Sequence, residues 1–302
     1  MNTGESLNIP SPISKLDYFQ NGNSVFIKHE NKIHPLFGGN KWRKLQYNIE
    51  ALKASGADCI LSFGGAFSNH LYALAMLTEH LGIPSVGIVR GEYQDKNNPS
   101  LNAIKKAGMK IHHVSKIAYR DKEASNEVKH VLQKYPHAFI IPEGGANAYA
   151  RLGFRDMMQE ISDLESYDFI FVAAGTGSTA SGIIEYAKAN NKVKVINVLK
   201  NASLGRSIDT DLENSVCSWE VIEEYHFGGF AKVTPALREF NHWFFNKYGI
   251  PLDPVYNAKA MYALIDMLRH GDLGANNRIL YIHTGGLQGI KAYEYRSGVS
   301  WQ

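Results

Sequence analysis

A lysine on a glycine-rich loop is the residue of this chain best suited to chemistry. Lys41 follows two glycines and Asn40, and helical spacing begins directly afterwards. Glycines let a backbone approach a ligand closely, and an amine that is desolvated near other cations loses its proton and becomes nucleophilic. Taken alone, the loop favours a solvated surface lysine in a basic cluster with Arg43 and Lys44. Three later glycine loops reverse that interpretation.

A second loop joins a predicted strand to a predicted helix and carries three polar side chains. The apolar run 59–63 leads into a Gly-Gly loop that ends in Ser68, Asn69 and His70. A serine at this place can simply cap the helix, but capping leaves the next two side chains unexplained. A helix N-terminus also offers free amides to a carboxylate. We therefore favour a carboxylate-binding loop over a purely structural one.

The third loop has the outline of a phosphate cradle, because it follows the apolar run 169–173 and opens a helix. Its residues are Gly175, Thr176, Gly177, Ser178 and Thr179. Backbone amides and hydroxyls there can hold an anion, with the helix dipole behind them. The loop lacks both the Gly-Lys-Ser/Thr ending of an ATP-type loop and the third glycine of the dinucleotide fingerprint. A cofactor monophosphate therefore fits better than a nucleotide, and the clustered hydroxyls make a plain turn the weaker alternative.

The remaining loops carry weaker signals. Thr284 stands beside two glycines after the apolar run 279–282, where its hydroxyl can reach the edge of a flat ligand or belong to a plain turn. Tyr256 lies in an Asp-Pro-Val-Tyr sequence at a helix start, and on its own it is typical of a packed core aromatic. The loop 142–147 also ends a predicted strand, but no chemistry can be assigned to it.

Short runs rich in valine and isoleucine alternate with segments of helical spacing, which is typical of parallel sheets covered on both faces. The predicted strands are 24–29, 59–63, 85–89, 110–114, 138–141, 169–173, 194–199 and 279–283. Predicted helices include 71–81, 126–135, 181–189 and 258–269. Parallel sheets bind ligands at the carboxyl ends of their strands, where these loops lie. Eight strands are many for one open sheet, so we predict two α/β units with a break near residues 147–153.

The composition excludes several classes of protein. The 302 residues carry a net charge of only +3, so we expect no nucleic-acid partner. No apolar stretch approaches the roughly 20 residues of a membrane helix, and residues 1–9 lack the apolar core of a signal peptide. Cys59 and Cys217 are too few for a disulfide framework and favour a reducing cytoplasm. We expect no metal site.

The motifs occur in a fixed order between about residue 35 and residue 286. Together, Gly-Gly-Asn-Lys, Ser-Asn-His, Gly-Thr-Gly-Ser-Thr, Asp-Pro-Val-Tyr and His-Thr-Gly-Gly resemble the pyridoxal-phosphate enzymes of the D-cysteine desulfhydrase and 1-aminocyclopropane-1-carboxylate deaminase family. The resemblance implies pyridoxal 5′-phosphate as the cofactor and a homodimer. It also implies fold type II, the tryptophan-synthase-β-like α/β fold of two open, twisted, mostly parallel sheets covered by helices. It places a large cofactor-binding domain at residues 1–45 and 152–302 and a small domain at 46–151.

The resemblance also implies how the cofactor is held. Lys41 matches the Schiff-base lysine, which also acts as the base at the substrate's α-carbon. Asn40 matches an asparagine that contacts the cofactor's 3-hydroxyl, and Thr284 matches a residue that bonds the pyridine nitrogen in desulfhydrase-like members. The phosphate cup is matched by Gly175, Thr176, Gly177, Ser178 and Thr179.

The substrate is assigned to other residues of the same motifs. Ser68, Asn69 and His70 match the loop that binds the substrate carboxylate, and in deaminases the serine is also a proposed nucleophile toward the cyclopropane ring. Tyr256 matches an active-site tyrosine near the substrate. We therefore predict Lys41, Ser68 and Tyr256 as catalytic residues.

Two departures from the family pattern bear on the reaction. Phe230 stands where relatives often carry a second tyrosine, and a phenyl ring has no hydroxyl to donate. Asn257 follows Tyr256 where deaminases carry a glutamate that keeps the pyridine nitrogen protonated. Both changes argue against ring-opening deamination and for an easier β-elimination.

These departures rank three functions. The favoured one is α,β-elimination from a small amino acid, D-cysteine above all, giving pyruvate, ammonia and hydrogen sulfide. The enzymatic alternative is 1-aminocyclopropane-1-carboxylate deamination, giving 2-oxobutanoate and ammonia. A non-catalytic protein that binds the cofactor or an amino acid is the alternative from another class.

Overall fold

The computed structural model describes residues 7–18, 21–92 and 97–301 and divides them into two compact units. We call residues 35–153 unit 1, and residues 7–34 and 154–301 unit 2. Residues 1–6 of the polar start of the chain lie outside the described residues. The predicted boundary at 151/152 falls next to this division, whereas the predicted boundary at 45/46 lies inside a continuous helix. The extent of independent domains stays a prediction.

Unit 1 contains a four-stranded, fully parallel sheet in the order β5-β4-β3-β6. Its strands are β3 (Cys59–Gly64), β4 (Ser85–Arg90), β5 (Lys110–Val114) and β6 (Ala138–Ile141). Its helices are α1 (Asn40–Ser55), α2 (Asn69–Leu81), α3 (Pro99–Lys106), α4 (Lys116–Asp121) and α5 (Asn126–Gln133), with short 3-10 turns at η2 (Lys122–Ala124) and η3 (Glu143–Gly145). Helix α6 (Ala148–Gln159) crosses the division between the units.

The sheet of unit 1 is buried on both faces because successive side chains of a strand point to opposite sides. In β3, Ile60 joins the cluster formed with α1, α2 and α3, whereas Leu61 and Phe63 join the cluster formed with α4 and α5. The apolar run that predicted this strand is therefore the signature of two-sided burial.

Unit 2 contains a six-stranded sheet in the order β1-β2-β10-β7-β8-β9, in which only β1 runs antiparallel to its neighbour. Its strands are β1 (Ile13–Lys15), β2 (Ser24–His29), β7 (Phe169–Ala174), β8 (Lys192–Asn197), β9 (Ser218–Ile222) and β10 (Arg278–His283). Its helices are α7 (Ser178–Tyr186), α8 (Leu204–Asp211), α9 (Pro235–Tyr248), α10 (Asn257–His270) and α11 (Gln288–Ser297), with 3-10 turns at η1 (Glu30–Lys32), η4 (Leu164–Ser166) and η5 (Glu224–His226).

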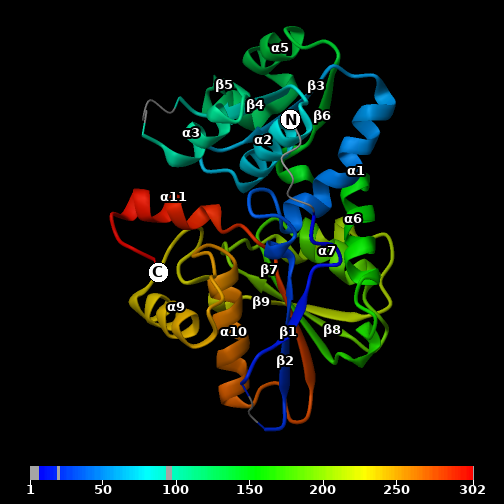
Figure 1. Cartoon of the computed structure of the whole chain (residues 1–302), viewed down its shortest axis with the longest axis vertical. Helices are drawn as coiled ribbons and strands as arrows, with labels where there is room; N and C mark the ends of the chain where they lie inside the picture. The colour runs from blue at the N-terminus through cyan, green and yellow to red at the C-terminus, as the bar shows by residue number, and fades with distance from the viewer. Residues whose placement is uncertain (1–6, 19–20, 93–96, 302) are drawn as a thin grey trace. The chain divides into compact units, whose positions relative to one another are not determined.

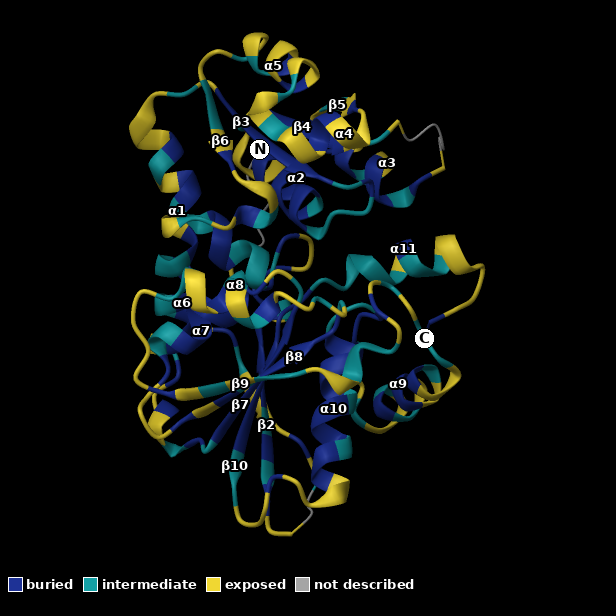
Figure 2. Cartoon of the chain, turned by 180° about the vertical axis from the view of Figure 1, so that it is seen from behind, coloured by how far each residue is buried: buried dark blue, intermediate teal, exposed yellow. Residues whose placement is uncertain are grey.

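Helices cover both faces of this sheet. Figure 1 shows α9 and α10 on one side of the strands and α6 and α7 on the other. Phe169 and Phe171 of β7 pack in the apolar cluster formed with α9 and α10, and Ile170 and Val172 pack in the cluster formed with α6 and α7. The central strands are dark blue, hence buried, in Figure 2. The carboxyl ends of β7 and β10 lead into the glycine loops singled out above.

The predicted α/β class with mostly parallel sheets is confirmed, with local differences. All eight predicted strands occur, but β8 spans Lys192–Asn197 rather than 194–199, because the apolar residues 198–199 already belong to the following loop. The two strands that were not predicted, β1 and β9, lie at the sheet's edges and lack a buried apolar run. No helix among the described residues is long and apolar enough to cross a membrane.

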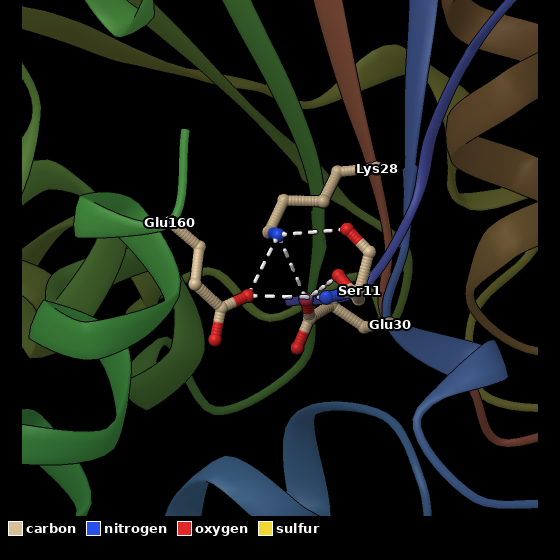
Figure 3. A network of polar contacts seen from close by, with 4 residues as sticks. All are labelled: Ser11, Lys28, Glu30 and Glu160. Carbon is tan, nitrogen blue, oxygen red and sulfur yellow. Dashed lines mark hydrogen bonds and ion pairs between the residues drawn. The ribbon is translucent and has the colours of Figure 1, made fainter. Parts of the chain in front are cut away.

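A buried ionic cluster lies at the carboxyl end of β2 (Figure 3). The ammonium of Lys28 lies 3.0 Å from Glu160 Oε2 and 3.6 Å from Glu30 Oε1, and it donates to the carbonyl of Ser11 at 3.4 Å. The Ser11 hydroxyl donates to Glu30 Oε1 at 2.5 Å, and the Ser11 amide donates to Glu160 Oε2 at 3.2 Å. The Lys28 and Glu30 side chains are fully buried. Lys28 thus supplies positive charge to two carboxylates inside unit 2.

Replacing Lys28 by methionine should destabilise the protein strongly, because one cation is removed from beside two carboxylates that stay out of water. We expect a loss of about 3–5 kcal/mol in the free energy of unfolding, the usual result of breaking a buried pair. Urea denaturation followed by far-UV circular dichroism measures it. The exposed Lys188, changed to methionine, is the control and should be near neutral. An equally small effect for Lys28→Met would mean that the cluster is dispensable.

Candidate active site

Lys41 lies in the first turn of α1, directly after a backbone turn that only glycine adopts easily. Gly39 is the residue before the helix and has φ 90° and ψ −167°, and its carbonyl accepts the first helical bond from Trp42 N at 3.0 Å. Asn40 opens the helix beside Lys41, and both are half-buried.

The amine of Lys41 is prepared for nucleophilic chemistry. Burial lowers the pKa of Lys41 to about 8. Within the described chain, no group accepts a hydrogen bond from it. About a tenth of the amine is therefore neutral at pH 7, a far larger fraction than for a lysine in water.

Ser68 caps helix α2, as the structural interpretation of its loop required. Its Oγ accepts a hydrogen bond from Leu71 N at 3.2 Å. A Cβ on Gly64 would lie only 2.6 Å from that Oγ, so the cap needs glycine at this position. The cap uses a lone pair of the hydroxyl and leaves its hydrogen free to donate to a ligand. Asn69 follows as the first residue of α2, and its half-buried amide has no partner within the described chain.

His70 is buried and has a defined tautomer. The hydroxyl of Ser62 donates to the carbonyl of Ile141 at 2.8 Å, because a carbonyl can only accept. The 2.8 Å contact between Ser62 Oγ and His70 Nε2 must then be donated by the histidine. Nε2 carries the proton, and Nδ1 is an acceptor that is buried without a partner among the described residues.

This tautomer limits what His70 can bind. Burial, followed by the charges of Lys41 and Lys44, holds the pKa of His70 well below its usual range, so the ring stays neutral. Its free Nδ1 suits an N–H donor of a ligand. The predicted contact with a carboxylate would require a proton on this nitrogen.

The loop 142–147, to which the sequence assigned no chemistry, packs against this histidine. Gly145 has φ 74°, and a Cβ there would lie 3.2 Å from His70 Cε1 and 3.3 Å from Lys44 Cβ. Only its two adjacent glycines hinted that something approaches the backbone closely. In unit 1, the structure therefore brings His70 and Gly145 together. It also places Lys41 and Lys44 near enough to lower the pKa of the His70 ring.

In unit 2, the predicted phosphate loop joins β7 to α7. Gly177 is the residue before the helix, with φ 99°, and a Cβ there would lie 3.0 Å from Ile208 Cγ1. The hydroxyls come from the exposed Thr176, the half-buried Ser178 and the buried Thr179. The first amides of α7 have no helical partners. Amides, hydroxyls and the positive end of the helix dipole thus meet on a loop that has no lysine or arginine.

Tyr256 lies against the same loop. A Cβ on Gly175 would lie 3.3 Å from Tyr256 Cε1 and 2.7 Å from Leu199 Cδ1. Burial, with a contribution from the charge of Asp253, raises the pKa of Tyr256 to about 12. The phenol therefore keeps its proton at neutral pH, so it can donate a hydrogen bond or act as an acid but does not act as a phenolate base.

The buried side chain of Asn257 links the turn at Asp253 to the loop at Thr284 and Gly285 through hydrogen bonds. Its Oδ1 accepts from Thr284 N at 3.1 Å and, weakly, from Thr284 Oγ1 at 3.4 Å. Its Nδ2 donates to Asp253 Oδ1 at 2.7 Å and to Gly285 O at 2.8 Å. Thr284 is thus positioned by a neutral amide.

Asp253 is a structural residue of the site that the sequence did not reveal. Its carboxylate accepts the backbone N–H groups of Val255, Tyr256 and Asn257 at 2.9–3.0 Å. The Asp-Pro pair at a helix start was the available signal, since aspartate bonds backbone amides a few residues further on. Asp253 therefore fixes the turn that presents Tyr256.

None of the clusters of histidine, cysteine, aspartate and glutamate in the described ranges is arranged to hold a metal ion. Cys59 and Cys217 are both buried and unbridged.

Comparisons with known proteins give a consistent result. A family model described as pyridoxal-phosphate dependent enzyme matches residues 5–285. The chain is 29% identical to the mitochondrial bifunctional D-cysteine desulfhydrase/1-aminocyclopropane-1-carboxylate deaminase of Arabidopsis thaliana, over 93% of this chain and 77% of the relative. It is 27% identical to the 1-aminocyclopropane-1-carboxylate deaminase of Ralstonia pickettii, over 94% and 93% of the two chains. A crystal structure of an ACC deaminase homologue superposes with a TM-score of 0.81 and 27% identity, over 97% and 94%.

Proposed function

Because the chain belongs to the family of pyridoxal-phosphate-dependent enzymes, we propose that it is a lyase that converts D-cysteine and water into pyruvate, ammonia and hydrogen sulfide. The preference for D-cysteine elimination rests on the surroundings of Thr284, the residue that we propose donates a hydrogen bond to the pyridine nitrogen of the cofactor. Thr284 is hydrogen-bonded to the neutral amide of Asn257. A carboxylate in place of that amide would hold a proton on the ring nitrogen, as deamination requires.

The residues present fit the cofactor. Lys41 offers an amine whose pKa is lowered to about 8, as imine chemistry with an aldehyde needs. The loop from Gly175 to Thr179 offers an anion site of amides and hydroxyls at the start of α7. Bound pyridoxal phosphate supplies the electron sink for a carbanion at the substrate's α-carbon.

The chain's own residues would do the rest. Lys41 as a neutral amine accepts the α-proton. Ser68 and Asn69 donate hydrogen bonds to the substrate carboxylate at the positive end of α2. The neutral Nδ1 of His70 accepts an N–H from the bound ligand. Tyr256 keeps its phenolic proton and can donate it to a departing group.

The names of the relatives favour a second candidate, 1-aminocyclopropane-1-carboxylate deamination. Purified protein mixed with each amino acid separates the candidates by the 2-oxo acid that is formed. D-cysteine gives pyruvate and sulfide, whereas the cyclopropane amino acid gives 2-oxobutanoate. Formation of neither 2-oxo acid would favour the non-catalytic binding protein.

The cellular setting is part of the same proposal. We place the enzyme in the cytoplasm, which agrees with two buried, unbridged cysteines, and we propose a homodimer. Subcellular fractionation tests the location, and sedimentation velocity measures the oligomeric state.

Asn69→Ala should weaken substrate binding and leave cofactor binding intact, because this amide is proposed to bond the carboxylate. Losing a hydrogen bond to a charged group costs about 1.5–3 kcal/mol, so KM should rise about ten- to a hundredfold. Initial rates give KM, and the visible absorbance of the cofactor reports its retention. Loss of the yellow colour would reassign Asn69 to the cofactor or to the structure of the loop.

Thr179→Ala should show the opposite pattern, because this hydroxyl is proposed to bond the phosphate. We expect cofactor affinity to fall about ten- to a hundredfold, with KM for the amino acid little changed once the cofactor is saturating. Titration of the apoprotein with pyridoxal phosphate measures it. Thr179→Ser, which keeps the hydroxyl, is the matched control, and equal affinity in all three proteins would remove Thr179 from the phosphate site.

A further inference from the structure

A buried lysine in unit 2 is used by none of the steps above. Lys259 lies on α10 and is 0% exposed. Its ammonium donates to three backbone carbonyls, those of Val198 at 3.0 Å, His226 at 2.9 Å and Gly229 at 2.7 Å. The three oxygens come from two loops and converge on one point.

The arrangement requires a positive charge at that point. An ammonium has three N–H donors, one for each carbonyl, whereas a neutral amine has two donors and a lone pair that would face the third oxygen. Burial lowers the pKa of Lys259 to about 8, and the carboxylate of Asp253 opposes the shift. The ammonium is therefore the main form at neutral pH.

The hydrogen bonds from Lys259 to the carbonyls of His226 and Gly229 hold a strained loop in place. Phe227 and Ala231 have φ 53° without being glycine, and Gly228 and Gly229 between them have φ 94° and 111°. Left-handed backbone at residues other than glycine is unfavourable and persists only when its surroundings impose it. Phe230, which stands where relatives often carry a tyrosine, belongs to this loop.

The loop is connected to the phosphate cup through one residue. A Cβ on Gly229 would lie 3.5 Å from the carbonyl oxygen of Leu199, and a Cβ on Gly175 would lie 2.7 Å from Leu199 Cδ1. Leu199 directly follows Val198, whose carbonyl Lys259 binds. The ammonium thus fixes the chain segment that packs against Gly175.

We propose that Lys259 is a tethered monovalent cation, whose ammonium fills a three-carbonyl cage of the kind that would otherwise bind K⁺ or NH₄⁺, and that it positions the Phe227–Ala231 loop and Leu199 beside the phosphate cup. Rings of backbone carbonyls bind such cations in place of water. Lys259 is a positioning residue, since it acts through Leu199 and the loop. This role of Lys259 rests on the proposed phosphate cup and is the same whichever amino acid is the substrate.

The test is the cation dependence of Lys259→Ala. Alanine leaves the three carbonyls without a donor and leaves room for a cation between them. In buffers whose only cation is tetramethylammonium, we expect the variant to bind pyridoxal phosphate about tenfold or more weakly than wild type. It should also be cleaved faster by trypsin after Lys232, which follows the loop. Excess NH₄⁺ or K⁺ should restore both properties, and wild type and the exposed-lysine control Lys291→Ala should be indifferent to the cation.

Each other result counts against the proposal. A loss that NH₄⁺ and K⁺ do not repair would make Lys259 a packing residue only, and an unchanged variant would remove it from the cup altogether. Wild type that itself needs K⁺ would mean that the cage is not filled by the lysine. Because the cell interior is rich in K⁺, Lys259→Ala should fold there, and failure of both this variant and Lys259→Gln to fold would also contradict a cage that K⁺ can fill.

Discussion

Lys41→Ala should abolish turnover and leave the fold unchanged. The neutral amine is proposed both to hold the cofactor and to move the α-proton, and loss of a proton-transferring group alone lowers rates by about 10²–10⁴-fold. We expect kcat/KM to fall by at least that much, with unchanged circular dichroism. Lys53→Ala, an exposed lysine on the same helix, is the control and should keep full activity.

Borohydride gives the same assignment a chemical readout. The wild-type holoprotein should be yellow, and reduction should fix the cofactor to the peptide that contains Lys41. Lys44 is buried three residues further on the same helix and is the nearest competitor in the sequence. A label found on Lys44, or on any other lysine, would overturn the assignment.

The lowered pKa of Lys41 predicts how the rate of cofactor capture depends on pH. Since burial lowers the pKa of this amine to about 8, the neutral form grows as the pH rises toward 8 and is nearly complete above 9. The rate at which apoprotein captures pyridoxal phosphate should rise with pH over this window and then level off. A rise that continues to pH 10 or beyond would indicate an ordinary, solvated lysine.

The fold was largely predictable because buried parallel strands have an unmistakable composition. The strands β2, β3 and β4 lie within one residue of the predicted limits, since each is a mostly buried run rich in apolar and β-branched residues. Strands β1 and β9, at the edges of the unit 2 sheet, were missed because neither carries a buried apolar run. The apolar residues Val198 and Leu199 extended the predicted strand beyond the end of β8, but they belong to the following loop, where Val198 is buried and Leu199 packs against the apolar core.

The loops of the candidate site were predictable as turns between strands and helices, whereas their contacts were not. Glycines mark where the backbone must turn or be approached, and they drew attention to Lys41, Ser68 and Gly175, whose roles toward cofactor and substrate stay predictions. The tautomer of His70 depends on Ser62 and on a carbonyl 79 residues beyond that serine. No local pattern contains that pairing, because it arises only when β3 and β6 become neighbours.

Lys259 shows the same limit. A lysine between alanines on an apolar helix was visible in the sequence, but its three acceptors lie 30 to 61 residues away along the chain. A buried charge predicts a partner. Which partner it has, and which loop it therefore holds, is decided by the packing of β8 and η5 around α10.

Comparison of the two substrates should give a kcat/KM for D-cysteine that exceeds the value for 1-aminocyclopropane-1-carboxylate by about 10²–10⁴-fold, the usual effect of a missing general acid. The thiolate of cysteine leaves readily once the α-proton is gone, so a modest electron sink suffices. Ring opening breaks a carbon–carbon bond with no α-proton to remove first. It needs a protonated ring nitrogen and an acid, which Asn257 and Phe230 do not supply.

The same reasoning predicts which variants fail to convert the enzyme. Phe230→Tyr adds a phenol on an exposed side chain of the loop and should raise ring opening only slightly. Asn257→Glu should not complete the change, because a second carboxylate would face Asp253 and the bonds from Nδ2 to Asp253 and Gly285 would be lost. That variant should lose stability, as a buried charge beside a like charge does. If wild type processes the cyclopropane amino acid faster than D-cysteine, a neutral Asn257 does not disfavour ring opening and the enzyme is a deaminase.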